Sequence, residues 1–479
     1  MKNSIGNPTI STLQILLYAF VISLSNSAIA QTWIPIHSGA AQNVPSVVLI
    51  DETSNYLTVR FDISGIYAKE VLTGQGEFQK IYFDHETNLT SSAPGTPSLP
   101  QLTEIIRAPI GHKAVIRSID ADWTEVGTIR IYPQQKPLRD GDSDDGFIFD
   151  ITTYESNEIL PNNIASVGIM QGWGGIPVTG LMVQPVRYTP ASQQLEITES
   201  ITVTVDFIPD PNQSIVVPQV PNYRMNRLHQ ASILNPPPVL PRPIDADENE
   251  PVRLLFIMLE EALETAQPLI NFHHASGNRS DIWLADEIED DVQIRTRITE
   301  MFEEGLEYVF IIGDGHIINP HVPLHWWDPE DPGEQPDNLP VASHSDSWYV
   351  CLDGPDRDGF DDHLPELAIG RLVYETNNLD QLEVQVNKLI NYIYWNGENR
   401  FDNAIGRALV IADNPTNGEQ HDDELEFFIG TKRRISEEDY DLPSPNFIQA
   451  FGDQNGITNQ FITEGMNEGV GIVNYRGHG

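Results

Sequence analysis

Cysteine is nearly absent from this chain, which has only Cys351 among its 479 residues. An internal disulfide is therefore excluded, and stability must come from packed cores and from any bound metal ions. Cys351 lies in the apolar segment WYVCLDG, where a thiol is more often a small packing group than a reactive thiolate. We expect Cys351 to be buried and structural.

Basic residues are also scarce, with 27 Lys and Arg against 70 Asp and Glu and a net charge of −43. This balance argues against nucleic acid and anionic membranes as partners and favours a soluble, cation-attracting surface. Apolar residues make up 40% of the chain, which is enough for packed cores in two or three domains.

The sequence lacks an apolar run of the ~20 residues that a membrane-spanning helix needs. The run at 15–24 follows Lys2 and precedes Ala28-Ile29-Ala30, which is the pattern of a secretory signal peptide. We expect residues 1–30 to be removed during export, leaving a secreted or cell-surface protein without a membrane span. A membrane anchor is the alternative.

Short runs of alternating apolar and polar residues fill residues 31–215, most clearly at 195–197 and 201–207. Alternation with threonine on the outer face predicts antiparallel sheet with one solvated side. We therefore predict an all-β sandwich domain over residues 31–215.

Residues 216–250 become rich in proline and then acidic, without a periodicity that could bury one face. Such composition is typical of a linker between domains. Arg224, Arg227 and Arg242 are candidate processing points in it.

After the linker, continuous apolar runs alternate with amphipathic helices. This pattern is typical of parallel strands that are covered on both faces of a sheet. The runs are 252–259, 308–315, 367–372, 407–413 and 469–475. Two helices are predicted between these runs. The first ends at Gly305, and its buried face consists of Ile294, Ile298, Met301 and Phe302. The second begins with Asn378 and Gln381 as a capping pair, and its buried face consists of Leu382, Val386, Leu389 and Ile393. For residues 251–479 we thus predict a doubly wound α/β domain with a mostly parallel sheet, and we expect this domain to be incomplete.

Polar residues follow three of these runs, namely Asp314, Asp413 and His478. Ligands and catalytic groups gather beyond the carboxyl ends of strands in an open parallel sheet, so we expect these residues to converge. Gly477 and Gly479 permit a sharp turn that presents the imidazole and a backbone N–H to one spot. The histidine could then act as a general acid or base. A histidine that merely ends a strand in a glycine turn is the alternative.

The segment GVGIVNYRGHG at 469–479 resembles the catalytic histidine segment of the gingipain-type cysteine peptidases, peptidase family C25, whose catalytic fold is caspase-like. Three further segments resemble that family's catalytic domain in order and spacing: 307–315, 343–349 and 364–372. Three others resemble the family's propeptide domain: 93–100, 129–137 and 183–197.

This resemblance implies a cysteine endopeptidase precursor that acts on proteins or peptides and carries its own propeptide as an intramolecular inhibitor. His478 matches the catalytic histidine, and the amide of Gly479 matches the oxyanion donor. Asp413 lies near the acidic residue that orients the histidine, although Pro415 stands where that carboxylate is expected. We expect the nucleophilic cysteine beyond Gly479, so that the chain as given is inactive.

Two acidic loops have the oxygen-rich composition that calcium prefers, although neither fits the EF-hand spacing. The first loop contains Asp353, Asp356, Asp358, Asp361 and Asp362, and the second contains Asp140, Asp142 and Asp144. The resembling family binds calcium in its catalytic domain, so we expect a structural calcium ion at the first loop. Solvated turns are the alternative.

Other chemistries find little support. His316, His321 and His325 lie close together, but Pro320 and Pro323 break any helix that would align them on zinc. No nucleophile elbow or phosphate-binding glycine loop occurs, so we expect no organic cofactor. A non-catalytic caspase-like surface scaffold and a secretion-system transpeptidase of the same family remain alternative functions.

Overall fold

The computed structural model describes residues 32–83, 90, 92–136, 146–220, 222–240, 252–285, 291–320, 345–353, 364–375, 378–393, 407–412, 446–451, 459–467 and 469–476. The chain divides into two compact units, residues 1–384 and 385–479. Among the helices in the described ranges, none has both the length and the apolar character needed to cross a membrane. The predicted signal peptide and the loop at Asp140, Asp142 and Asp144 lie outside the described residues.

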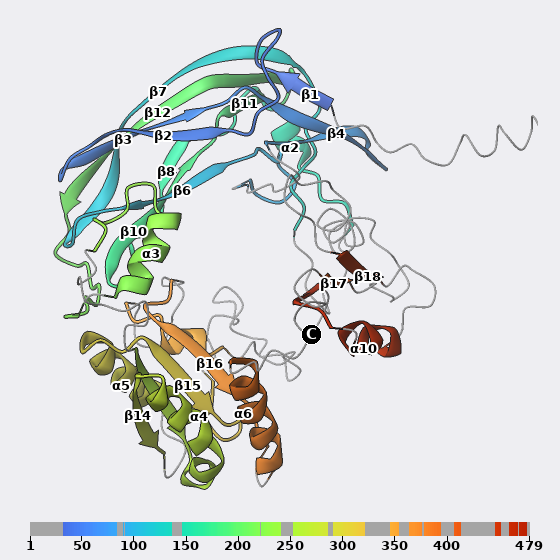
Figure 1. Ribbon diagram of the computed structural model, residues 1–479. Coiled ribbons are helices and arrows are strands. Elements are labelled where there is room, and N and C mark those ends of the chain that lie inside the picture. The colour runs from blue at the N-terminus through green and yellow to red at the C-terminus, as the bar shows by residue number, and fades with distance from the viewer. Residues whose placement is uncertain are drawn as a thin grey trace, which may run out of the picture. The chain divides into compact units, whose positions relative to one another are not determined.

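The N-terminal part of the first unit consists of antiparallel sheets (Figure 1). Its strands are β1 (Thr32–Pro35), β2 (Ser46–Glu52), β3 (Tyr56–Asp62), β4 (Gly65–Thr73), β5 (Gly76–Tyr82), β6 (Leu102–Arg107), β7 (His112–Thr128), β8 (Ala165–Val167), β9 (Gln171–Trp173), β10 (Ile176–Val183), β11 (Val186–Thr189) and β12 (Gln194–Pro209). A short helix, α2 (Ile151–Tyr154), interrupts them. The strand orders are β1-β4-β5, β6-β10-β8 with β9 beside β10, and β11-β12-β3-β2 with β7 beside β12. The predicted antiparallel architecture is confirmed, with three sheets where the sequence predicts the two layers of a sandwich.

The core of this part follows directly from the alternation in the sequence. In β12 the side chains of Leu195, Ile197, Ile201, Val203 and Val205 are all fully buried. They join one hydrophobic cluster with residues from all three sheets, while the intervening threonines of the 201–207 stretch are only partly buried. The period-two pattern therefore identifies the face that packs inward.

A helix occupies part of the stretch that the sequence predicts as a linker. Helix α3 (Tyr223–Ser232) begins after Asn222, whose side chain accepts hydrogen bonds from the backbone N–H groups of Arg224 (3.0 Å) and Met225 (2.9 Å). An asparagine in this position satisfies the otherwise unpaired N–H groups of the first turn. Residues 223–232 of the predicted linker are therefore helical.

Helix α3 packs on the sheet that contains β10 (Figure 1). His229 meets the ring of Trp173 edge to face at 5.2 Å between centroids. Beyond the helix, the side chain of the buried residue Asn235 accepts a hydrogen bond from the backbone N–H of Arg107 at 2.7 Å. Residues 222–235 thus belong to the packed N-terminal part, because their apolar and polar side chains both find partners there.

Acid should loosen the attachment of α3. Burial lowers the pKa of His229 to about 4, although a hydrogen bond with the Trp173 backbone acts in the opposite direction. The unfolded segment therefore binds a proton that the folded one does not between pH ~6.5 and ~4, so the stabilisation is complete above that range and is lost as the pH falls through it. We expect a loss on the order of 3 kcal/mol from this group, measured as lower hydrogen-exchange protection factors of the α3 amides at pH 4 than at pH 7, where each factor is the intrinsic exchange rate at that pH divided by the observed rate.

The variant His229→Phe isolates this effect, because it keeps a ring against Trp173 but cannot take up a proton. Its protection factors should depend on pH only through the other titrating groups. An unchanged pH dependence in the variant would assign the acid effect to those groups instead of His229.

The C-terminal part of the first unit contains a parallel sheet with the order β14-β13-β15-β16. Its strands are β13 (Arg253–Met258), β14 (Arg279–Leu284), β15 (Tyr308–Ile312) and β16 (Ala368–Leu372). Helices α4 (Leu263–Ala275) and α5 (Asp291–Glu303) lie beside the sheet (Figure 1). All residues from Leu254 to Met258 are buried, as expected for an interior parallel strand covered on both faces. Three of these strands match predicted apolar runs, whereas β14 and α4 were not predicted.

The two predicted helices are present. In α5 the side chains of Ile294, Ile298, Met301 and Phe302 are buried, and Gly305 follows the helix with a φ of 95°. Glycine adopts this left-handed conformation without the steric cost that other residues meet. The second helix, α6 (Leu379–Ile393), buries Leu382 and Val386 as predicted, whereas Leu389 is only partly buried.

The predicted capping pair of α6 is formed differently. The side chain of Gln381 accepts a hydrogen bond at 3.0 Å from the backbone N–H of Glu375, which precedes the helix. The backbone N–H of Gln381 donates to the carbonyl of Asn378. The glutamine therefore ties the incoming chain to the first turn of the helix.

The second unit contains a separate parallel sheet with the order β18-β17-β19. Its strands are β17 (Arg407–Ala412), β18 (Asn446–Phe451) and β19 (Ile472–Arg476), and helix α10 (Asn459–Asn467) packs against β18. The runs predicted at β17 and β19 are confirmed as strands, while β18 was not predicted.

Candidate functional site

The carboxyl ends of β17 and β19 lie side by side. The two strands are parallel, and Ala412 is the register partner of Arg476, so both strands end at the same level of the sheet. Neighbouring strands are about 4.8 Å apart in the hydrogen-bonding direction. Asp413 follows Ala412 in the sequence, and Gly477, His478 and Gly479 follow Arg476. These predicted site residues lie outside the described residues.

Strand β19 is much more exposed than its neighbour. The exposed fraction is 62% for Ile472 and 51% for Tyr475, whereas Leu409 and Val410 in β17 are buried. Apolar side chains on a parallel strand are normally covered on both faces of the sheet. The sheet edge at β19 is therefore a surface on which further polypeptide could pack.

The strand before Asp314 and the strands before Asp413 and His478 belong to different sheets. Because Asp413 and His478 lie outside the described residues, their convergence with Asp314 stays a prediction. Asp314 follows β15, which belongs to the four-stranded sheet of the first unit, whereas β17 and β19 form a different sheet. Among the described strands, no pairing joins the two sheets. Similar apolar runs thus predict parallel strands correctly but do not reveal which strands share a sheet.

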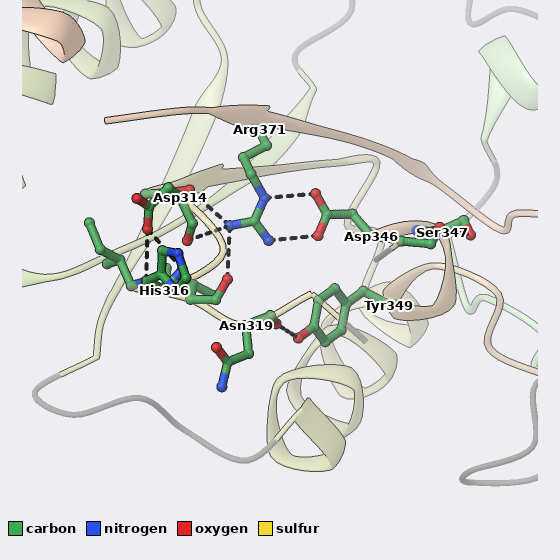
Figure 2. A network of polar contacts seen from close by, with 11 residues as sticks. Asp314, His316, Asn319, Asp346, Ser347, Tyr349 and Arg371 are labelled. Carbon is green, nitrogen blue, oxygen red and sulfur yellow. Dashed lines mark hydrogen bonds and ion pairs between the residues drawn. The ribbon is translucent and has the colours of Figure 1, made fainter. Parts of the chain in front are cut away.

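Arg371 organises the carboxyl edge of the first parallel sheet (Figure 2). Its guanidinium group binds both carboxylate oxygens of Asp346, at 2.8 Å from Nε and 2.6 Å from Nη2. Its Nη1 also donates to the carbonyl oxygens of Gly313 (2.8 Å), Ile318 (2.9 Å) and Asp314 (3.3 Å). The donors of Arg371 are thus engaged by protein groups, and the residue serves the structure of this edge.

Asp314 caps a turn at the same edge. Its Oδ1 atom accepts hydrogen bonds from the backbone N–H groups of His316 (2.8 Å) and Ile317 (3.0 Å) (Figure 2). This pattern is the usual local use of an aspartate after a strand. The hydroxyl of Tyr349 donates to the carbonyl of Asn319 nearby. His321 and His325, the other members of the rejected zinc cluster, lie outside the described residues.

Cys351 is buried as predicted, with an exposed fraction of 6%. Its backbone carbonyl accepts hydrogen bonds from Nε (3.1 Å) and Nη2 (2.5 Å) of the buried Arg295. The guanidinium group of Arg295 also lies over the ring of Trp348, 4.8 Å from its centroid. A thiol in such a packed segment is poorly placed to reach a substrate.

Asp353 is the only member of the first predicted calcium loop within the described residues. Its Oδ1 atom accepts a hydrogen bond from the backbone N–H of Val216 at 2.5 Å, and its carbonyl accepts one from the hydroxyl of Ser214 at 3.3 Å. The part of the chain that the structure describes holds no group of three side chains suited to a metal ion.

Sequence reasoning missed Arg295, Arg371 and Glu366. Glu366 is fully buried, and its Oε2 atom accepts a hydrogen bond from the backbone N–H of Leu352 at 2.7 Å. Their positions in the sequence could have identified them, since each of these charged residues lies among apolar residues in or beside a predicted helix or strand. Charged residues are seldom buried unless they are paired.

The chain matches known sequences along most of its length. Residues 247–479 match Peptidase family C25, and residues 38–219 match Propeptide_C25. Gingipain R1 of Porphyromonas gingivalis is 23% identical over 446 residues, which cover 91% of this chain and 41% of that protein. Gingipain R2 of the same organism is 22% identical over 447 residues, which cover 91% of this chain and 56% of that protein.

Among solved structures, a complex of the pro- and mature domains of RgpB from Porphyromonas gingivalis is similar with a TM-score of 0.35 and 18% identity, over 40% of this chain and 99% of that chain. The present chain spans between about two fifths and just over half of the length of the two gingipains.

Proposed function

Because this chain belongs to peptidase family C25 and carries that family's propeptide, we propose that it is the N-terminal portion of an exported cysteine endopeptidase zymogen. Residues 1–30 are the proposed signal peptide, 31–215 the propeptide domain, and 251–479 the first part of a caspase-like catalytic domain. The observation that carries this proposal is the pairing of a propeptide match and a peptidase match in one chain, in that order.

The proposed reaction is hydrolysis of a peptide bond by a cysteine and a histidine. His478 takes the thiol proton or pairs with the thiolate, which attacks the scissile carbonyl. The backbone N–H of Gly479 stabilises the resulting oxyanion. Asp413 orients the far ring nitrogen of the histidine and thereby selects the tautomer that accepts the proton. The nucleophile is supplied by a cysteine that follows residue 479 in the full-length protein.

The register of β17 and β19 supports this assignment. Since Ala412 and Arg476 are partners in parallel strands, the residues that follow them start from adjacent positions at the same sheet edge. That edge is where catalytic groups gather in open parallel sheets. The exposed β19 is the proposed site at which the strand leading to the nucleophile packs.

The propeptide is proposed to keep the enzyme latent until the chain is cut between Asn222 and Glu250. Of the candidate processing points, Arg224 lies in helix α3 and forms an ion pair with Glu307, which disfavours cleavage there because a protease needs an extended substrate. Cutting should therefore occur after the helix. A structural calcium ion on the loop from Asp353 to Asp362 is part of this proposal and rests on the acidic composition of the loop.

Alkylation of the full-length protein tests the function. After cleavage of the linker, the protein should hydrolyse unfolded protein substrates, and iodoacetamide should abolish this activity by reacting with the nucleophilic thiolate. The matched control is Cys351→Ser, which removes the one thiol of the present chain. Because Cys351 is buried, this variant should keep its activity within about threefold and remain sensitive to iodoacetamide.

Four outcomes would contradict parts of the proposal. A full-length protein without hydrolytic activity would favour a surface scaffold, and transfer of the acyl group to an added amine in place of water would favour a transpeptidase. Loss of iodoacetamide sensitivity in Cys351→Ser would make Cys351 the reactive thiol. An uncut protein that works as fast as the cut one would remove the latency role of the propeptide.

A further inference from the structure

The contact between the propeptide part and the parallel-sheet part of the first unit centres on one carboxylate. Asp353 receives the backbone N–H of Val216 on Oδ1 (2.5 Å) and the hydroxyl of Ser214 on its carbonyl oxygen (3.3 Å). Gly172 in β9 lies against the same side chain. A methyl group added at Gly172 would overlap the Asp353 carboxylate and would lie 3.0 Å from Oε1 of Glu366.

The residues behind Asp353 hold it in place. Arg295 binds the carbonyl of Cys351. The side chain of Glu366 binds the N–H of Leu352, and the backbone N–H of Glu366 donates to the carbonyl of Val350 at 2.9 Å. A group that is fixed before its partner arrives binds more tightly, because less conformational freedom is lost.

The other polar contacts described between these two parts could be made by several different residues. The N–H of Gln219 donates to the carbonyl of Glu303 at 3.0 Å, which any residue except proline could do. Arg224 and Glu307 form an ion pair at 3.1 Å, with side chains 32% and 15% exposed, and a lysine could supply the same positive charge to this single contact. Among these contacts of the described residues, the Asp353 contact is the one that requires particular residues on both sides, an acid on one and a glycine on the other.

We propose that Asp353 is the docking residue that retains the propeptide after the linker has been cut, and that Gly172 is the position that fits it. The proposal rests on the proposed function, since it concerns how a cleaved propeptide stays bound. Its occupant is this chain's own segment formed by β9 and residues 214–216. The backbone φ of Gly172 is outside the left-handed region, so alanine there is compatible with the strand and acts mainly through the overlap with Asp353.

The test uses the full-length protein with a specific protease site placed between Leu240 and Val252. After cleavage, size-exclusion chromatography over a dilution series gives the Kd for retention of the propeptide. Gly172→Ala should raise this Kd about tenfold or more, because overpacking a filled site is costly. The matched control is Gly180→Ala in the adjoining strand β10, where the added methyl group would meet Cγ2 of Thr103 at 3.6 Å, an ordinary contact; its Kd should stay within about twofold.

A double-mutant cycle separates this contact from a general effect on folding. Asp353→Ala should itself raise the Kd about tenfold, since the Val216 N–H loses a charged acceptor. In the Asp353→Ala protein the overlap is gone, so Gly172→Ala should add less than about threefold. An undiminished effect of Gly172→Ala in that protein would overturn the proposal, and so would a wild-type Kd for Asp353→Ala alone.

Retention of the propeptide is measured without catalysis, so the two hypotheses fail separately. A cleaved protein that follows these predictions but hydrolyses no peptide contradicts the proposed function and not the docking contact. An active peptidase whose Gly172→Ala propeptide is retained with the wild-type Kd contradicts the docking contact and not the function.

Discussion

Replacing His478 with alanine in the full-length, cleaved protein is expected to lower kcat/KM for peptide hydrolysis by about a thousandfold. The imidazole is the proposed proton acceptor for the nucleophilic thiol, and positioned general acid–base groups contribute roughly 10²–10⁴ in rate. The proton-transfer role predicts that the loss lies mainly in kcat, because an interaction made in the transition state is removed. Steady-state kinetics with an unstructured peptide library measures both parameters.

His316→Ala is the matched control. His316 also follows an apolar parallel strand, β15, but it lies at the edge of the other sheet and takes part in the Asp314 turn through its backbone N–H. That bond is kept when the side chain is removed, so activity should stay within about twofold. Full activity of His478→Ala, or an equal loss in both variants, would show that His478 has no special part in catalysis.

Local patterns in the sequence were sufficient to predict β12 and five of the seven described parallel strands. In β12 the alternation from Leu195 to Phe207 gave both the strand and its buried face, and the run at 252–259 gave the interior strand β13. Such predictions succeed because the side-chain period of a strand is a property of the chain itself. The same holds for α5, whose apolar stripe at Ile294, Ile298 and Met301 has helical spacing.

Long-range contacts explain what was missed. Helix α3 lies in a proline-rich stretch without an apolar stripe, and its packing depends on Trp173, more than fifty positions earlier in the chain. The division of the parallel strands into two sheets was missed for the same reason, because the pairing of strands depends on segments that are distant in the sequence. For the candidate site, the positions after β17 and β19 followed from sequence, whereas the role of Arg371 depends on partners from three segments.

The engagement of Asp353 also changes how its acidic loop is understood. Composition alone favours a calcium ligand, but in this structure one carboxylate oxygen accepts the N–H of Val216. Any calcium bound by Asp353 while the propeptide is in place would have to share this carboxylate with the propeptide. Asp353 therefore contributes to the contact between the two parts of the first unit. The spacing of the aspartates in the sequence does not predict this contact.

Arg371→Leu is expected to destabilise the first unit by about 3 kcal/mol, because it strands a partly buried carboxylate and three carbonyl oxygens. The arginine and Asp346 side chains are 13% and 22% exposed, so water can replace only part of the lost bonding. Arg371→Lys should recover less than half of this loss, since a single ammonium group cannot reproduce the planar fork that binds Asp346 through two nitrogens. Urea denaturation followed by tryptophan fluorescence measures the free energy of unfolding.

The control for this prediction is Arg297→Leu, which removes an arginine from a surface pair with Glu300. That arginine side chain is 55% exposed, and such pairs contribute about 0–1 kcal/mol. The Arg371 variant should also loosen the chain around Ile318 and Asp346, because both residues bind the same guanidinium group. Faster hydrogen exchange at 313–318 and at 346–350, with no change in β13, is therefore the local signature of this role, and a uniform increase across the sheet would contradict it.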